Sequence, residues 1–165
     1  MNTAHDDAVL TATPGRYLTF HLGSARYAVS VTDVHTVIRM VPVTSVPLMP
    51  PHVRGVINLR GAVIAVIDLR AKFCMPEIEY NDRACILVFD LGVGAPGNRL
   101  LGVIVDAVDD VLVLSANQIE PTPDFASQVD ARYLLGVATV SDSVFAILNI
   151  KTILAVDGSL SLPSI

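Results

Sequence analysis

The sequence contains no tryptophan, only two cysteines and few charged residues. Hydrophobic residues make up 52 % of it and charged residues 16 %, which is typical of a chain that buries a core and not of a disordered tail. Cys74 and Cys85 do not form a C-x-x-C motif, so we expect neither a redox motif nor a zinc site, and no cofactor is predicted. Reduced thiols in a cytoplasmic protein are the simpler interpretation.

Clusters of positive charge and long apolar runs are also missing. The net charge is −5, and the Lys and Arg residues are scattered, which disfavours a protein that binds nucleic acid by neutralising phosphates. The longest apolar runs, residues 62–67 and 84–89, are too short to cross a bilayer. The acidic N-terminus does not resemble a signal peptide. We therefore expect a cytoplasmic protein that reaches a membrane only through a partner.

Two pairs of segments repeat in the same order along the chain. Residues 55–69 (GVINLRGAVIAVIDL) match residues 136–150 (GVATVSDSVFAILNI), and residues 27–37 match residues 101–111. The shared apolar positions indicate one small β-unit that is used twice. The central turns differ, since NLRG in the first copy faces TVSD in the second. A feature found in one copy is not required by the shared architecture, so the NLRG turn is a candidate functional site.

Short apolar runs separated by Gly and Pro predict an all-β fold. We expect two packed, five-stranded SH3-like β-barrels related by internal duplication, because each half has roughly the size of such a barrel. Short helical turns and a short C-terminal helix over residues 150–155 complete the expected fold. The expected divisions of the chain are a flexible leader (1–15), one domain (16–155) with intertwined or adjacent subdomains at about 16–83 and 84–155, and a tail (156–165).

Several motifs resemble those of the CheW family of chemotaxis coupling proteins. Residues 55–61 fit the G-V-x-N-L-R-G hairpin of that family, and residues 66–70 (VIDLR) fit the strand that follows, with Ala65 where Pro is usual. Further similarities cover about residues 16–155; they lie at residues 46–50 (VPLMP), 102–106 (GVIVD), 119–121 and 133–137.

The resemblance implies two five-stranded barrels side by side and a non-catalytic adaptor. Proteins of this family join membrane chemoreceptors to the histidine kinase CheA, whose regulatory domain has the same double-barrel fold. The chain departs from the family pattern at Thr36, where the family often has a Glu implicated in partner contact. The resemblance and the broken repeat together give the expected partner-binding residues, which are Val34, Thr36, Val37, Asn58, Leu59, Arg60, Gly61 and Val63.

Arg60 is the residue of this set that we expect to contribute most to binding. An Arg at a hairpin tip presents a planar array of donors suited to carboxylates and carbonyls. The alternative is an internal ion pair with Asp68 that only steadies the hairpin. We expect Gly61 to be structural, with a positive φ at the reversal, and Asn58 to hydrogen-bond within its own turn.

The apolar candidates on the first unit, Val34, Val37, Ile38 and Val63, have two open interpretations. An adaptor needs exposed apolar surface with a polar rim, but each of the four residues could equally belong to the core.

A rival hypothesis is a small β-barrel enzyme or metal-dependent hydrolase that uses Asp106, Asp109 and Asp110. Grouped carboxylates can hold a metal or act as acid and base, but no nucleophile or phosphate-binding loop accompanies them in the sequence. Solvated loop acids are the preferred interpretation of the three. The histidines at positions 5, 21, 35 and 52 show no spacing typical of metal ligands.

Overall fold

The computed structural model describes residues 12–76, 78–91, 100–122 and 131–158. Most of the predicted leader (1–11) and most of the predicted tail (159–165) lie outside these residues. In the described part of the chain, no helix is long and apolar enough to span a membrane.

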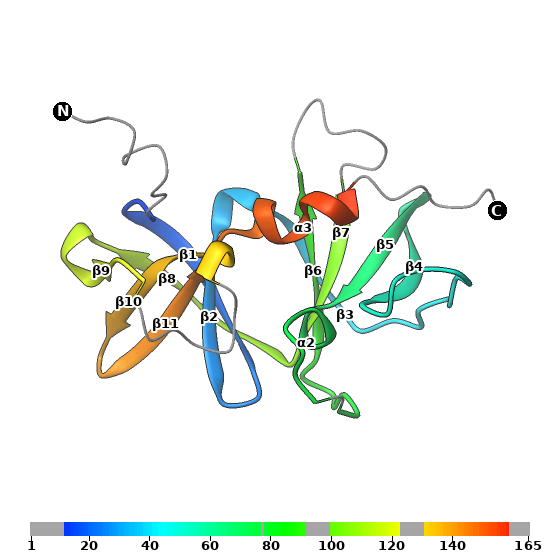
Figure 1. The fold of residues 1–165 in the computed structure, drawn as a ribbon, viewed down its shortest axis with the longest axis horizontal. Helices are drawn as coiled ribbons and strands as arrows, with labels where there is room; N and C mark the ends of the chain where they lie inside the picture. Colours follow the sequence, from blue (N-terminus) through cyan, green and yellow to red (C-terminus); the bar gives the residue numbers. More distant parts are fainter. Residues whose placement is uncertain (1–11, 77, 92–99, 123–130, 159–165) are drawn as a thin grey trace.

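Strands dominate the structure, so the predicted all-β class is confirmed (Figure 1). The strands are β1 (Gly15–Leu22), β2 (Ala25–Ser30), β3 (Val34–Arg39), β4 (Val53–Leu59), β5 (Ala62–Asp68), β6 (Cys85–Asp90), β7 (Leu100–Val105), β8 (Ala107–Leu114), β9 (Ile119–Glu120), β10 (Leu134–Val140) and β11 (Ser143–Leu148). The helices are α2 (Leu69–Lys72) and α3 (Ile150–Gly158), with 3₁₀ turns η1 (Val31–Asp33), η2 (Ala116–Gln118) and η3 (Ala131–Tyr133).

The strands form two sheets that lie side by side in Figure 1. One has the order β8-β1-β2-β11-β10-β9 and is called the terminal barrel here, because it joins strands from both ends of the chain. The other has the order β3-β6-β7-β5-β4 and is called the middle barrel. Strands on both sides of residue 83 enter each sheet. The boundary expected near residues 83 and 84 therefore does not coincide with the division between the sheets.

The two copies of the predicted repeat exchange strands, so that each barrel contains strands of both copies. Strands β1 and β2 of the first copy pair with the last strands of the second copy, and the reverse holds in the middle barrel. The register agrees residue by residue. Ala146 lies opposite Tyr27 in the parallel pair of β11 and β2, and Ala65 lies opposite Leu101 in the parallel pair of β5 and β7. These are equivalent positions of the two copies. The middle barrel combines three strands of the first copy with two of the second, and the terminal barrel combines two of the first with four of the second. The expected five strands therefore hold for the middle barrel, whereas the terminal barrel has the two-residue strand β9 as a sixth.

A short antiparallel pairing of two segments closes each barrel beside a glycine. In the middle barrel, Thr44 and Val56 exchange two backbone hydrogen bonds of 2.9 Å, and Gly55 has a φ of +148°. In the terminal barrel, Glu120 lies opposite Val137, and the equivalent Gly136 has a φ of +147°. A Cβ atom on either glycine would collide with the backbone carbonyl oxygen of the closing strand, of Thr44 or of Glu120.

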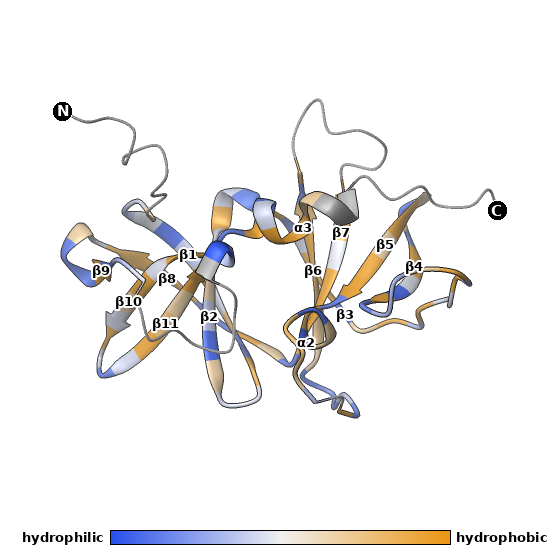
Figure 2. Ribbon diagram, in the orientation of Figure 1, coloured by the Kyte–Doolittle hydropathy of each residue, from blue (hydrophilic) through white to orange (hydrophobic). Residues whose placement is uncertain are grey.

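Alternating residues of the central strands supply different hydrophobic cores. In β6, Ile86 and Val88 point into the middle barrel, whereas Leu87 and Phe89 point toward the other barrel. The second set joins residues of β1, β2, β7, α2 and α3 in one cluster, called the interbarrel core here. Because the central strands are buried on both faces, they are almost continuously apolar (Figure 2). The high hydrophobic content therefore fills three cores, one within each barrel and one between them.

Candidate partner-binding site

Five of the expected partner-binding residues lie together on the hairpin of β4 and β5. Arg60 and Gly61 form its two-residue turn with φ angles of 52° and 90°, as expected of a type I′ turn. The side-chain Oδ1 of Asn58 accepts a hydrogen bond of 2.9 Å from the N–H of Gly61. The predicted positive φ at Gly61 and the predicted role of Asn58 are therefore confirmed. Leu59 and Val63 are half-buried beside the turn.

Arg60 does not form the internal pair with Asp68 that was its alternative role. Its side chain is exposed at the turn. The carboxylate of Asp68 accepts a hydrogen bond of 3.1 Å from Arg54 and one of 3.0 Å from the hydroxyl of Tyr80. It also caps α2 by accepting from backbone N–H groups of the helix. The guanidinium of Arg60 is thus presented to solvent on a rigid two-residue turn.

The other three expected residues lie on β3, which alternates between inward and outward positions. Val34 and Thr36 are half-buried, and Val34 packs against the interbarrel core. Ile38 is also half-buried and packs inside the middle barrel. Val37 points outward with 41 % of its area exposed. The expected site therefore has two parts, one on β3 and one at the tip of the β4–β5 hairpin.

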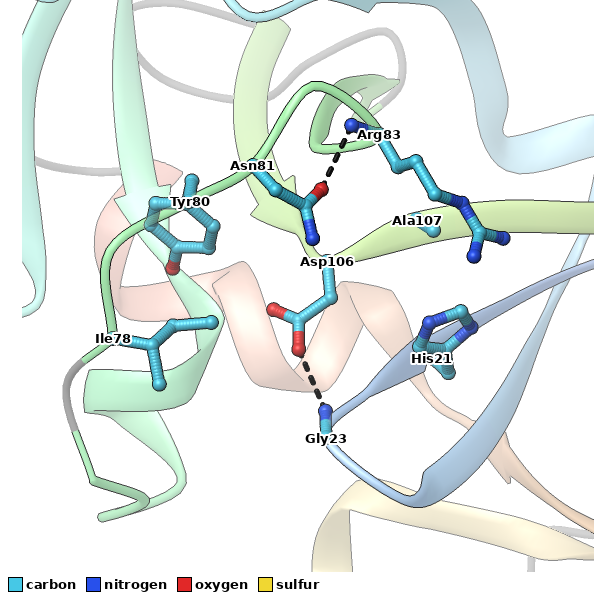
Figure 3. A pocket seen from close by; sticks show the side chains of 8 residues that line it. All are labelled: His21, Gly23, Ile78, Tyr80, Asn81, Arg83, Asp106 and Ala107. Atoms are coloured by element: carbon cyan, nitrogen blue, oxygen red, sulfur yellow. Dashed lines mark hydrogen bonds between the residues drawn. The ribbon is translucent and has the colours of Figure 1, made fainter.

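A buried ion pair that the sequence analysis did not foresee lies where the chain crosses from one barrel to the other. Asp106 lies between β7 of the middle barrel and β8 of the terminal barrel. Its carboxylate accepts from Nε of Arg70 at 3.0 Å and from Nη2 at 2.6 Å. It also accepts a hydrogen bond of 2.6 Å from the N–H of Gly23 in the turn of β1 and β2 (Figure 3). The pair therefore joins α2, the crossover and the terminal barrel.

The prediction of solvated loop acids is wrong for two of the three carboxylates. The side chains of Asp106 and Asp109 are 12 % and 19 % exposed. Asp109 accepts from Nδ1 of His21 at 3.1 Å, since the two strands that carry them pair. Asp110 is exposed, and within the described residues only its backbone is bonded, to the hydroxyl of Thr19. Asp106 ends the GVIVD motif and Arg70 ends VIDLR, but nothing in either motif indicates that the two side chains pair.

A small pocket of about 100 Å³ lies beside Asp106 (Figure 3). Its walls come from the end of β1, the segment before β6 and the crossover; the lining residues are His21, Gly23, Ile78, Tyr80, Asn81, Arg83, Asp106 and Ala107. The carboxylates in this region already bond protein groups. Within the described residues, no group of three or more His, Cys, Asp and Glu side chains could hold a metal ion.

The ion pair changes the protonation behaviour of the groups around it. Burial alone raises the pKa of Asp106, but the hydrogen bonds from Arg70 and from the N–H of Gly23 outweigh it, so this pKa is lowered below its ordinary value. The hydrogen bond to Asp106 raises the pKa of Arg70. Burial, followed by the negative charge of Asp68, raises the pKa of the Tyr80 phenol. All of these groups keep their ordinary charge at neutral pH.

We expect the Arg70–Asp106 pair to contribute to acid sensitivity. A carboxylate with a lowered pKa in the folded state stabilises the fold above its ordinary pKa of 3.8, and this contribution is lost as the pH falls through the lower folded value. The difference in unfolding free energy between the wild type and Asp106→Asn should therefore shrink below pH 3.8. Urea unfolding at a series of pH values measures it, and a constant difference down to pH 2 would contradict the assignment.

Known proteins match this chain over nearly all the residues that form the two barrels. The family model described as CheW-like domain matches residues 16–157. "Chemotaxis protein CheW" of Klebsiella aerogenes is 32 % identical over 139 residues, which are 84 % of this chain and 81 % of that protein. The protein of the same name from Bacillus subtilis is 36 % identical over 109 residues, 66 % of this chain and 67 % of that protein.

Two further matches extend the comparison to structure and to a differently named relative. The scaffolding protein TtCheW from Thermoanaerobacter tengcongensis has a TM-score of 0.76 and 31 % identity, with 89 % of this chain and 92 % of that chain covered. Protein FrzA of Myxococcus xanthus is 29 % identical over 131 residues, 79 % of this chain and 78 % of that protein. The double-barrel fold of this chain is thus shared with that scaffolding protein. The chain belongs to the CheW-like domain family.

Proposed function

We propose that this protein is a non-catalytic scaffold that couples chemoreceptors to a CheA-type histidine kinase in chemotaxis or a chemotaxis-like motility pathway. The observation that carries the proposal is the match of one CheW-like domain to residues 16–157, which supports treating residues 16–155 as one functional unit. The names of the relatives, chemotaxis proteins and a scaffolding protein, agree with it. Such a scaffold would be found at receptor arrays, held there by its partners.

The two surfaces of the expected site suit two kinds of contact. The outward side of β3 offers the exposed Val37, between His35 and Arg39, for packing against the regulatory domain of the kinase. The tip of the β4–β5 hairpin offers the guanidinium of Arg60 and polar groups of the turn, which suit acceptors at the rim of an interface. We propose that a helical receptor tip binds between the barrels while the kinase binds at β3.

Pull-down of the purified chain with the regulatory domain of its host's CheA-like kinase, and with a cytoplasmic receptor fragment, tests this function. Retention of both partners at once is the expected result, because a coupling protein must hold them together. Retention of neither partner would overturn the proposal.

We expect Arg60→Ala to weaken coupling and leave the fold intact. The equivalent residue of the other copy is Ser141, which has nearly the same φ, 48° against 52°, so the turn itself does not need an arginine. A surface substitution of this kind changes stability by about ±0.5 kcal/mol. Thermal unfolding and receptor-stimulated kinase activity measure the two effects, and Arg26→Ala, at another exposed arginine, is the control. A large drop in melting temperature would show a structural role instead.

We expect Thr36→Glu to weaken binding of the cognate kinase or receptor. Thr36 is half-buried on β3, opposite Val88 of β6, so a carboxylate there would lose solvent without gaining a partner. The same change should improve binding to partners from a system whose adaptor carries Glu at this position. The measurement is the affinity of the wild type and of Thr36→Glu for the cognate partners and for partners from a system whose adaptor carries Glu. Tighter cognate binding by the variant would mean that a basic partner residue is present.

A further inference from the structure

The loop between β3 and β4 displays a leucine at its tip. Leu48 is fully exposed, at 103 % of its reference area, and its φ of 64° lies in the left-handed region. It follows Pro47, and the two residues form a turn whose second position with a positive φ favours Gly or Asn. A leucine at this place combines backbone strain with exposed apolar surface. No packing within the described part of the chain offsets either cost.

The chain on both sides of this turn is fixed to the middle barrel. Before it, Thr44 exchanges two backbone hydrogen bonds with Val56 of β4. After it, Met49 is half-buried against the interbarrel core, and the N–H of Val53 donates to the carbonyl of Pro50 at 3.0 Å. The backbone that carries Leu48 is therefore positioned before any partner arrives. Such preorganisation lowers the entropy cost of binding.

We propose that Leu48 is an apolar anchor that inserts into an uncharged pocket on the regulatory domain of the kinase. The inference rests on the proposed function and names a contact within it. Residues 40–51 contain no Asp, Glu, Lys or Arg, so the complementary surface is uncharged as well. The loop continues directly from β3, and Val37 and Val41 expose 41 % and 39 % of their areas on the same segment. The anchor thus extends the surface of β3 that is assigned to the kinase.

Two other modes of recognition fit the structure less well. Residues 47–50 read P-L-M-P, which resembles a ligand of aromatic-lined, proline-binding grooves. Those grooves bind an extended helix with φ of about −75°, and the φ of Leu48 is 64°. Insertion into a membrane would need basic neighbours or a larger apolar surface, and this loop has one protruding leucine and no basic residue.

The test compares Leu48→Asn with Leu48→Met in the full-length chain. Asn adopts a positive φ more readily than Leu, so we expect Leu48→Asn to unfold at the same temperature as the wild type or higher. Its affinity for the kinase regulatory domain should fall at least about tenfold, since buried anchors dominate interfaces, while its affinity for a receptor fragment is unchanged. Leu48→Met keeps an apolar side chain and should bind within about threefold of the wild type.

The control is Val144→Asn, at an exposed apolar residue of β11 in the terminal barrel, which should leave kinase affinity unchanged. Unaltered kinase binding by Leu48→Asn, or loss of receptor binding alone, overturns the inference while leaving the proposed function in place. A lower melting temperature of Leu48→Asn overturns the argument from strain. Binding of the wild type, but not of Leu48→Asn, to vesicles of phosphatidylglycerol and phosphatidylethanolamine would overturn the inference, because Leu48 would then contact a lipid surface and not the kinase. Failure of the wild type to bind kinase or receptor counts against both proposals.

Discussion

Gly55→Ala is expected to prevent closure of the middle barrel and to leave little folded protein. The added Cβ would lie 2.0 Å from the carbonyl oxygen of Thr44 and 2.6 Å from its carbonyl carbon. Both atoms belong to backbone that is hydrogen-bonded to Val56, so they cannot move away without breaking the pairing. Overpacking costs about 1–3 kcal/mol, and a non-glycine residue in this region of φ adds about 1–3 kcal/mol. The sum of about 2–6 kcal/mol reaches the lower end of the stability of a typical domain, which is about 5–15 kcal/mol.

The matched control for this prediction is Gly61→Ala. Gly61 also has a positive φ, but no atom lies within 4 Å of the position that its Cβ would occupy. Asp142 occupies the equivalent position in the second hairpin with a φ of 69°, so a side chain is tolerated in that conformation. The cost should be about 1–2 kcal/mol. Urea unfolding and soluble yield separate the variants, and equal effects of Gly55→Ala and Gly61→Ala would refute the assigned clash.

Asp106→Asn is expected to cost about 3 kcal/mol or more, because it leaves the charge of Arg70 without its partner. Loss of one member of a buried ion pair typically costs about 3–5 kcal/mol, and these side chains are 8 % and 12 % exposed. Replacement of both, as Arg70→Met with Asp106→Leu, should recover much of the loss, since apolar pairs of similar size often substitute for buried charges. Unfolding free energies of Arg70→Met, Asp106→Leu and the double variant form the cycle that measures this.

Asp110→Asn is the control, four residues further along the chain. Its side chain is exposed, and in the part of the chain that the structure describes only its backbone is bonded. A change within about ±0.5 kcal/mol is therefore expected. A cost of Asp106→Asn as small as that of Asp110→Asn would mean that Arg70 finds another acceptor. A double variant that is no more stable than Arg70→Met alone would show that the crossover needs the carboxylate for the N–H of Gly23.

The hairpin of β4 and β5 was accessible to sequence reasoning because its determinants are local. Asn58 and Gly61 are three residues apart, and their hydrogen bond and turn geometry follow from residue type and spacing. The family resemblance added two predictions that local determinants could not supply, namely the double-barrel arrangement and the class of protein. The resemblance was informative because its motifs are spread over about residues 16–155 at consistent spacing, whereas NLRG by itself is a weak signal.

The environment of Asp106 and of Arg60 could not be inferred in the same way. Asp106 and Arg70 are 36 residues apart, and Gly23 is 83 residues from Asp106, so their meeting depends on the exchange of strands between barrels. The antiparallel register of β4 and β5 puts Arg54, at the base of the hairpin, beside Asp68, whereas Arg60 lies at the tip. The strain at Leu48 was likewise invisible, because residues 46–50 look like an extended proline-rich segment until the positive φ is known.

The sequence by itself determined the β class, the duplicated unit and the NLRG turn, since these follow from local periodicity, turn chemistry and the comparison of one copy with the other. The tertiary structure decided which copy supplies each strand, which carboxylates are buried and which way the residues of β3 face. The physical reason is that a duplicated apolar pattern permits each copy to close on itself or on the other. Only the crossovers at η1 and Asp106, fixed by packing between distant strands, select the exchanged arrangement.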